Sequence, residues 1–218
     1  MSKRSNAPLE DVVLNDVAPA SIDPEDVHAA LESDRAVVRQ RGAQVCATLA
    51  GDDVERVRPF VEKLGTVLHD DNAGVVQTAA SALQEIAAAD VPAVTAVVDD
   101  MAMLTTSALP SIQLAGAQLL ADVAKEQPSA CVSAVGTLVE RLEHHSGTTD
   151  HDSLAAHVDD RETQEAIQRR EQEDQEYGKY ARHLVANVVV AVADEHPEAV
   201  VDHVETVADL ATKDDGTV

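Results

Sequence analysis

The stretch VRQRGAQVCATLA, at residues 38–50, decides the fold because the chain repeats it. Residues 75–87 read VVQTAASALQEIA and begin 37 residues later, and residues 112–124 read IQLAGAQLLADVA after a further 37. A fourth copy, ARHLVANVVVAVA at residues 181–193, is displaced by 69 residues because additional residues intervene. A fixed period in this range indicates stacked copies of one helical unit.

The copies agree chemically in four columns. The first column is small, the second is alanine, and the other two are larger and apolar, with the following members: Gly42, Ala79 and Gly116; Ala43, Ala80, Ala117 and Ala186; Cys46, Leu83, Leu120 and Val189; Leu49, Ile86, Val123 and Val192. Their spacing places the columns on one face of an α-helix. The small residues beside this face let neighbouring helices approach closely.

The columns resemble HEAT repeats, whose unit is a pair of antiparallel helices. Residues 58–87 carry the match, with a first helix, an acidic turn and a second helix formed by Pro59, Val61, Leu64 and Leu68, then Asp70 and Asp71, then Val75, Ala79, Ala80, Leu83 and Ile86. The resemblance covers about residues 24–212. It implies an all-α fold, an α-solenoid of about four HEAT-like helical hairpins plus a closing C-terminal helix.

The helix signals divide the chain into a mobile tail at 1–22, one solenoid domain at 23–212 and a second mobile tail at 213–218. The first helices of the hairpins are predicted at 24–32, 53–69, 91–105 and 128–144, and the second helices at 36–50, 73–88 and 109–125. We expect Pro59 to kink its helix and Gly51 to follow a helix end. The closing helix is predicted at about 197–212.

One arginine column differs between the repeats. Arginine occupies it at Arg39 and Arg182, but Val76 and Gln113 replace it in the other two copies. A continuous ladder of aspartate–arginine pairs between the hairpins is therefore not expected.

An insertion at about 145–176 interrupts the fourth hairpin. Its second part has opposite charges four residues apart, at Arg161–Glu165, Glu165–Arg169 and Arg170–Asp174, which stabilise an exposed helix. This segment could continue into the last repeat as one helix from about 160 to 194, with Gly178 inside it. A disordered acidic loop is the alternative, and the two remain open.

The charge is strongly acidic, with 40 acidic against 16 basic residues and a formal net charge of −24. Aromatic residues make up 1% of the chain. This composition resembles that of haloarchaeal cytosolic proteins, in which concentrated salt screens repulsion between surface carboxylates. We therefore expect a cytoplasmic protein that binds no nucleic acid, and no apolar run is long enough to cross a membrane.

The first candidate site is a track of uncharged polar residues on the second helices. It consists of Gln40, Gln44, Gln77, Ser81, Gln118, His183 and Asn187, with Leu114 interrupting one row. In HEAT-like arrays the second helices line the inner face, so the track suits a peptide backbone or a partner helix. The alternative is that these residues bridge adjacent helices as interior polar contacts.

The second candidate is the insertion with its flank, which carries Arg169, Arg170, Tyr177 and Tyr180. Arginine and aromatic side chains are favoured interface anchors. These two candidates predict a non-catalytic scaffold or adaptor that binds another protein and needs no cofactor. The oligomeric state is left open.

A metal-binding protein or metal-dependent enzyme is the alternative function. Its ligands would come from the histidine-rich start of the insertion, at His144, His145, His151, Asp152 and His157. The spacing fits no standard pair of ligands on a helix. Cys46 and Cys131 lie in apolar helix columns, so we predict buried thiols rather than nucleophiles or a disulfide.

Overall fold

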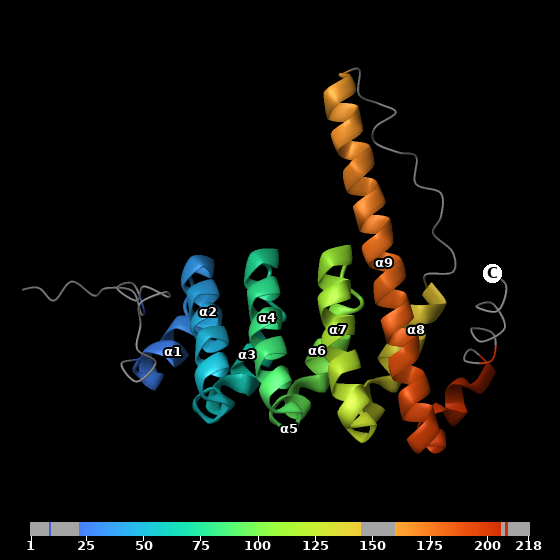
Figure 1. Ribbon diagram of the computed structural model, residues 1–218, viewed down its shortest axis with the longest axis horizontal. Helices are drawn as coiled ribbons and strands as arrows, with labels where there is room; N and C mark the ends of the chain where they lie inside the picture. Colours follow the sequence, from blue (N-terminus) through green and yellow to red (C-terminus); the bar gives the residue numbers. More distant parts are fainter. Residues whose placement is uncertain (1–8, 10–21, 145–159, 206–207, 209–218) are drawn as a thin grey trace, which may run out of the picture. The chain divides into compact units, whose positions relative to one another are not determined.

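The computed structural model describes residues 9, 22–144, 160–205 and 208. All regular elements within these ranges are helical (Figure 1), which confirms the predicted all-α class and its helical hairpins. The chain forms two compact units, Met1–Met101 and Ala102–Val218, and each is described by itself below. The division into one domain and two mobile tails stays a prediction, because most tail residues lie outside the described ranges.

Unit 1 contains two hairpins. In the first, α1 (Pro24–Leu31) packs on α2 (Ala36–Asp52). In the second, the 3₁₀ segments η2 (Val54–Arg56) and η3 (Arg58–Phe60) lead into α3 (Val61–Val67), which packs on α4 (Ala73–Ala89). Helices α2 and α4 lie side by side and run in the same direction (Figure 1). The segments α5 (Val91–Val94) and η4 (Thr95–Val97) follow, and the unit boundary falls within α6 (Val98–Leu104).

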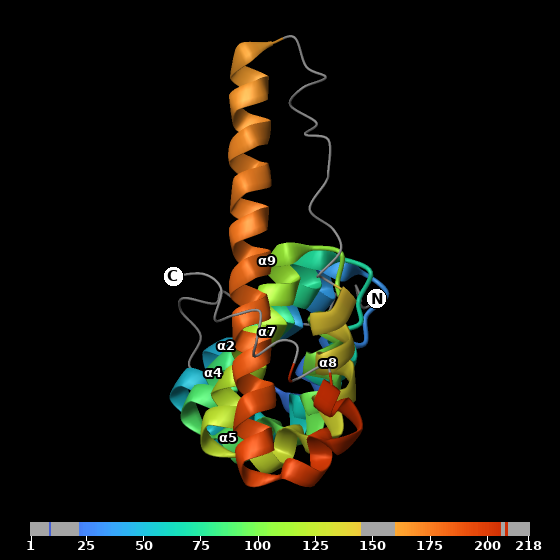
Figure 2. The same ribbon diagram turned by 90° about the vertical axis from the view of Figure 1, so that its right-hand side faces the viewer.

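Unit 2 is organised around the pair α7 (Pro110–Glu126) and α9 (Arg161–Glu195). Between them come η5 (Pro128–Ala134) and α8 (Val135–His144), and η8 (Pro197–His203) follows α9. Helix α9 packs along α7 and then continues well past its end (Figures 1 and 2). One uninterrupted helix of 35 residues confirms the first of the two alternatives left open, a helix that continues into the last repeat, and contradicts a disordered loop at residues 161–176.

The repeat columns form the core of each unit, as predicted. Ala43, Cys46, Ala79, Leu83 and Ile86 are fully buried in unit 1. Ala117, Leu120, Val123 and Val192 are fully buried in unit 2, and Val189 nearly so. Gly42 shows why its column is small, because a Cβ atom there would lie 3.1 Å from a methyl carbon of Leu31. Ala186 departs from its column and is half-buried.

The predictions for the first helices of the hairpins were wrong at the N-terminal ends of these helices. The segments predicted as single helices at 53–69, 91–105 and 128–144 begin instead with short helical or 3₁₀ turns that contain Pro59, Pro92 and Pro128. The closing segment likewise begins as the 3₁₀ segment η8 after His196. Pro59 lies inside the predicted helix, where proline donates no N–H bond and clashes with the carbonyl four residues earlier, so an α-helix cannot run through it undisturbed. Pro92, Pro128 and Pro197 lie in the first turn of their segments, where proline is tolerated, so proline does not explain the short turns there.

Gly51 was also predicted wrongly. Helix α2 continues through Gly51 to Asp52, and the extended residue Asp53 ends it with φ −155°. Gly51 does not adopt a positive φ, so the end of the helix does not depend on glycine. Asp53 then begins the next segment, where its carboxylate accepts a hydrogen bond from the backbone N–H of Glu55 at 3.1 Å.

Candidate functional site

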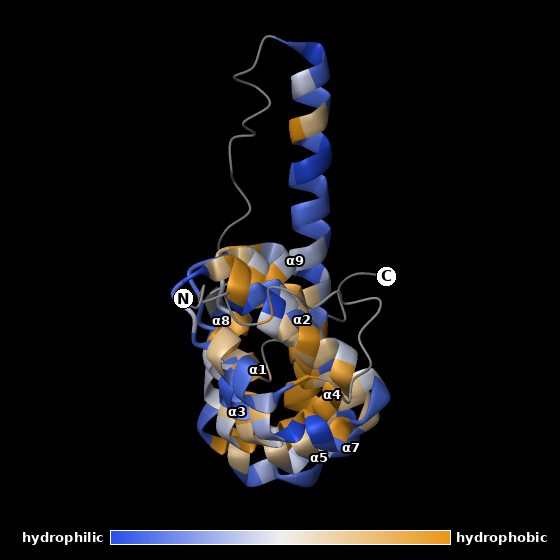
Figure 3. Ribbon diagram, turned by 90° about the vertical axis from the view of Figure 1, so that its left-hand side faces the viewer, coloured by the Kyte–Doolittle hydropathy of each residue, from blue (hydrophilic) through white to orange (hydrophobic). Residues whose placement is uncertain are grey.

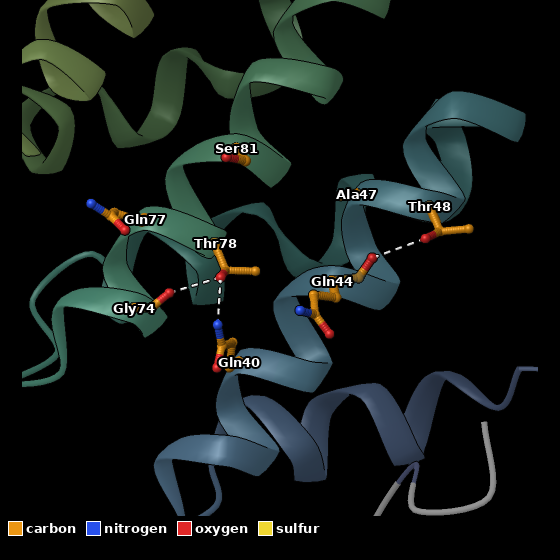
Figure 4. Close-up of a pocket in the computed structure, with 8 residues that line it drawn as sticks. All are labelled: Gln40, Gln44, Ala47, Thr48, Gly74, Gln77, Thr78 and Ser81. Atoms are coloured by element: carbon orange, nitrogen blue, oxygen red, sulfur yellow. Dashed lines mark hydrogen bonds between the residues drawn. The ribbon is translucent and has the colours of Figure 1, made fainter. Parts of the chain in front are cut away.

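Four residues of the predicted polar track meet in one pocket of unit 1. Gln40 and Gln44 come from α2, and Gln77 and Ser81 come from the matching turns of α4 (Figure 4). The pocket has a volume of about 470 Å³. Its other lining residues are Ala47, Thr48, Gly74 and Thr78. The 37-residue repeat produces this grouping, because it places equivalent turns of α2 and α4 beside each other.

Hydrogen bonds fix one side of this pocket, which we call the α2–α4 pocket. Gln40 Nε2 donates to Thr78 Oγ1 at 3.2 Å, and Thr78 Oγ1 donates to the carbonyl of Gly74 at 2.7 Å. Thr48 Oγ1 donates to the carbonyl of Gln44 at 3.0 Å. The side chains of Gln44 and Ser81 make no hydrogen bond to any residue within the described ranges.

The sequence reasoning missed four lining residues, Ala47, Thr48, Gly74 and Thr78. Helical spacing could have found the two threonines, because Thr48 lies one turn after Gln44 and Thr78 is adjacent to Gln77. The two small residues carry no chemical signal in the sequence. They become part of the site because their size leaves the space between the helices open.

The rest of the predicted track lies in unit 2. Gln118 is half-buried on α7, and His183 and Asn187 are exposed on α9. These three residues do not line the α2–α4 pocket. Gln40 makes a polar contact between adjacent helices through its bond from α2 to Thr78 on α4, which is the kind of contact considered as the alternative from the sequence. Gln77 and Gln118 also interact with other residues.

The second candidate surface is the half of α9 that extends past α7, residues 161–180. Arg169, Arg170 and Tyr180 are exposed there, and Tyr177 is 37% exposed. Asp160 caps the helix by accepting a bond from the N–H of Thr163 at 2.9 Å. This half is mostly hydrophilic along its length (Figure 3), and the buried residues of α9 begin only at Ala181.

Two of the three charge pairs predicted for this helix are formed. Arg161 Nε lies 3.0 Å from Glu165 Oε1, and Arg170 Nε lies 3.3 Å from Asp174 Oδ2. These spacings of four residues stabilise a helix that lacks a packing partner on most of its surface. The extension therefore forms from its own sequence, which leaves its outer side chains exposed to a partner.

The predicted metal ligands His145, His151, Asp152 and His157 lie outside the described residues. His144 ends α8, and its side chain is not described. Across the ranges that the structure covers, no group of three or more histidine, cysteine, aspartate or glutamate side chains could hold a metal ion. None of the described helices combines the length and apolar character needed to cross a membrane.

The two cysteines are buried free thiols, as predicted. Burial raises the pKa of Cys46 to about 12 and that of Cys131 to about 11. The thiolate is the nucleophilic form of cysteine, so both side chains are poor nucleophiles at neutral pH.

Comparison with known proteins places these observations in context. A sequence model of the family described as non-SMC mitotic condensation complex subunit 1 matches residues 23–159. A crystal structure of an engineered protein is similar over 78% of this chain and 69% of its own chain, with 22% identity and a TM-score of 0.49. The search of curated proteins found no match.

Proposed function

Because this chain belongs to the family of non-SMC mitotic condensation complex subunit 1, with its HEAT-like helical hairpins, we propose that it is a non-catalytic scaffold. In this role it binds another protein within a complex. The family name describes a subunit of a complex, and a subunit acts by contacting partner proteins. No observation on the described residues favours the metal-dependent alternative over this one.

The observation that carries the proposal is the α2–α4 pocket. Its eight lining residues are all uncharged, although the chain has 40 acidic residues. Amide and hydroxyl groups there provide both donors and acceptors, as a peptide ligand requires. The site holds no pair of nucleophile and base, which supports binding without catalysis.

The extension of α9 is the second proposed contact surface. It exposes Arg169, Arg170 and Tyr180 on a helix that its own charge pairs stabilise. Arginine and tyrosine are enriched among the residues that dominate binding energy at protein interfaces. Binding here would need little ordering of the backbone, because the helix is already formed.

Site-specific photocrosslinking tests the proposal. Val37→Cys at the edge of the pocket and Ala166→Cys on the extension each introduce an exposed thiol, to which a photoreactive crosslinker is attached through its maleimide group. Val37 lies about one helical turn before Gln40 and does not line the pocket, so the attached group leaves the pocket open. The natural thiols should react poorly, because burial raises the pKa of Cys46 to about 12 and of Cys131 to about 11. Ala88→Cys, exposed on α4 outside the pocket, is the matched control.

We expect illumination in a concentrated-salt extract of the source cells to give the same protein adduct from position 37, from position 166 or from both. The control at position 88 should give none. Equal adducts from all three positions, or none from 37 and 166, would contradict the scaffold proposal. A cytoplasmic location and a haloarchaeal type of composition stay predictions.

A further inference from the structure

We propose that the α2–α4 pocket binds an extended segment of the partner protein that is uncharged apart from a lysine or arginine at one end. The basic residue lies beside the C-terminal turns of α2 and α4. This inference rests on the proposed scaffold function and adds the chemical class and the polarity of the ligand. Three features of the pocket support it: unused hydrogen-bonding groups, small lining residues and a negatively charged end.

The unused groups suit a main chain rather than a helix. The amide of Gln44 and the hydroxyl of Ser81 make no hydrogen bond within the described residues, and they lie on opposite helices of the pocket (Figure 4). Each can donate and accept, and an extended chain presents both N–H and C=O groups along its length. A helix uses these groups internally. The main chain of an extended segment can therefore form hydrogen bonds with Gln44 and Ser81, whereas a helix could form them only through its side chains.

The small lining residues restrict the side chains that the segment carries. Ala47 and Gly74 lie on opposite helices of the pocket. A Cβ atom at Gly74 would lie 3.2 Å from Asn72 Oδ1 and 3.7 Å from Gln40 Nε2, so the backbone there is already closely approached. With a volume of about 470 Å³ shared between helices, the pocket accommodates a short segment with small residues such as serine, glycine or alanine.

Negative charge distinguishes one end of the pocket from the other. Exposed Asp52 lies one helical turn after Thr48, and exposed Glu85 lies one turn after Ser81, so both carboxylates lie at the same end. The parallel helices α2 and α4 also direct the negative ends of their dipoles toward this end. A basic residue is favoured there, and an acidic residue is repelled. A second copy of this chain, with its net charge of −24, is a poor source for such a segment.

A random twelve-residue peptide library displayed on phage provides the probe. Selection is made on the full chain in about 1 M KCl, with counter-selection on Ala47→Leu, which fills the pocket. We expect the enriched peptides to share small uncharged residues next to a lysine or arginine and to lack aspartate and glutamate. The enriched peptide is then labelled with fluorescein, and its affinity is measured by fluorescence anisotropy.

Two filling variants and one control decide the result. Ala47→Leu and Ser81→Leu, on opposite helices, should each weaken the peptide by about tenfold or more, because its hydrogen bonds are lost. Ala88→Leu, on α4 outside the pocket, should leave the affinity unchanged. Circular dichroism checks that each variant is folded, and having two filling variants keeps the test decisive if one of them is not.

The polarity has its own test. The double variant Asp52→Asn/Glu85→Gln should weaken the basic peptide about threefold, but not the same peptide with glutamine in place of its basic residue. Lowering the salt to the lowest concentration at which the circular dichroism spectrum stays unchanged should enlarge the difference, because charges are then screened less. Enrichment of acidic or helical peptides, equal binding to the filled variants, or no enrichment would overturn the inference. Crosslinking from position 166 that persists in any of these cases would leave the scaffold proposal standing and remove this inference.

Discussion

Arg39 ties the first hairpin of unit 1 to the second. Its Nη2 donates to Asp70 Oδ1 at 2.9 Å, its Nε donates to the other carboxylate oxygen, and its Nη1 donates to the carbonyl of Ser33 at 2.8 Å. The Asp70 side chain is 6% exposed. The hydrogen bond from Arg39 holds the pKa of Asp70 below its usual value, against the opposing effect of burial.

Arg39→Gln should therefore destabilise the fold in a pH-dependent way. Asp70 has a lower pKa in the folded chain than in the unfolded chain, so its contribution is present above an unfolded pKa of about 3.9. This contribution is lost as the pH falls through the folded pKa. We expect Arg39→Gln to lower the free energy of unfolding by about 1–2 kcal/mol at neutral pH, with the difference shrinking below about pH 4.

Urea unfolding at pH 7 and pH 3 measures this difference. Lys63→Gln is the matched control, because Lys63 forms a more exposed pair with Glu32 at 2.8 Å and should matter less. A destabilisation by Arg39→Gln that is the same at both pH values would show that the loss comes from packing rather than from the ion pair.

The same column in unit 2 shows what the sequence could not reveal. Gln113 donates from Nε2 to the carbonyl of Ser107, just as Arg39 donates to its own turn. Its Oε1 then accepts from Arg141 Nη2 at 2.7 Å, so the next hairpin supplies the cation. The aspartate–arginine pair is therefore absent at this position, in line with the prediction, and an amide–arginine bond takes its place. A column-by-column comparison did not predict this replacement, because donor and acceptor exchange places between neighbouring repeats.

At the scale of the element, two glycines in helices should respond oppositely to alanine. Gly178 lies within α9, and a Cβ atom there would meet nothing within 4 Å. At Gly65 in α3, a Cβ atom would lie 2.5 Å from Val97 Cγ1 and 2.8 Å from Asp100 Oδ2. We expect Gly178→Ala to stabilise α9 by up to about 1 kcal/mol, because alanine favours the helix.

Gly65→Ala should destabilise unit 1, because Val97 and Asp100 must move to make room. Thermal unfolding followed by circular dichroism, at one salt concentration for both variants, gives the two shifts. A stabilising Gly65→Ala would show that these neighbours relax freely. A destabilising Gly178→Ala would show that α9 is not helical at this position in solution.

The second helices of the hairpins were predictable, and the first helices were only partly so. Helices α2, α4 and α7 begin and end within two residues of the prediction, because continuous apolar columns define them. The first helices contain proline, and the choice between a kinked α-helix and a 3₁₀ start depends on small local energies that no column records. The insertion was predictable as a helix only as one of two alternatives, since its charge pairs contribute a few tenths of a kcal/mol each.

For the whole molecule, the charge predicts a dependence on salt. With a net charge of −24, self-repulsion should be screened in about 1 M KCl, where the Debye length is about 3 Å. At about 0.05 M KCl the Debye length exceeds about 10 Å, and we expect helicity to fall. Circular dichroism across this range is the measurement, with refolding on return to molar KCl as the control. A spectrum that stays constant would remove the argument for a halophilic protein.

Many residues of the candidate sites could be predicted from the sequence, but the pocket that they line could not. The track of amides correctly grouped the four members that line the α2–α4 pocket, because repeat spacing translates directly into neighbouring helix turns. It did not predict that Ala47 and Gly74 would leave a space between these helices. The pocket exists because alanine and glycine at these positions are small, and the pattern of polar residues in the sequence does not show this.

The last prediction concerns the extension of α9. Replacing residues 146–174 with a short Gly/Ser turn should leave unit 2 folded, because the buried residues of α9 all lie after the replaced segment. They are Ala181, Val185, Val188, Val189 and Val192. Closing a loop costs free energy that changes slowly with its length, so the melting temperature in molar salt should move by only a few degrees. Partner capture should nevertheless be lost, because the exposed arginines are removed.

A second variant, Arg169→Gln/Arg170→Gln, keeps the helix and separates the two effects. Both side chains are exposed, so this variant should melt like the parent chain and still lose most partner capture in the crosslinking experiment from position 37. If the shortened chain captures the same partner with the same yield, the extension is a spacer and the α2–α4 pocket carries the binding. If the shortened chain fails to fold, the protruding half of α9 stabilises unit 2 through contacts that its exposed side chains do not indicate.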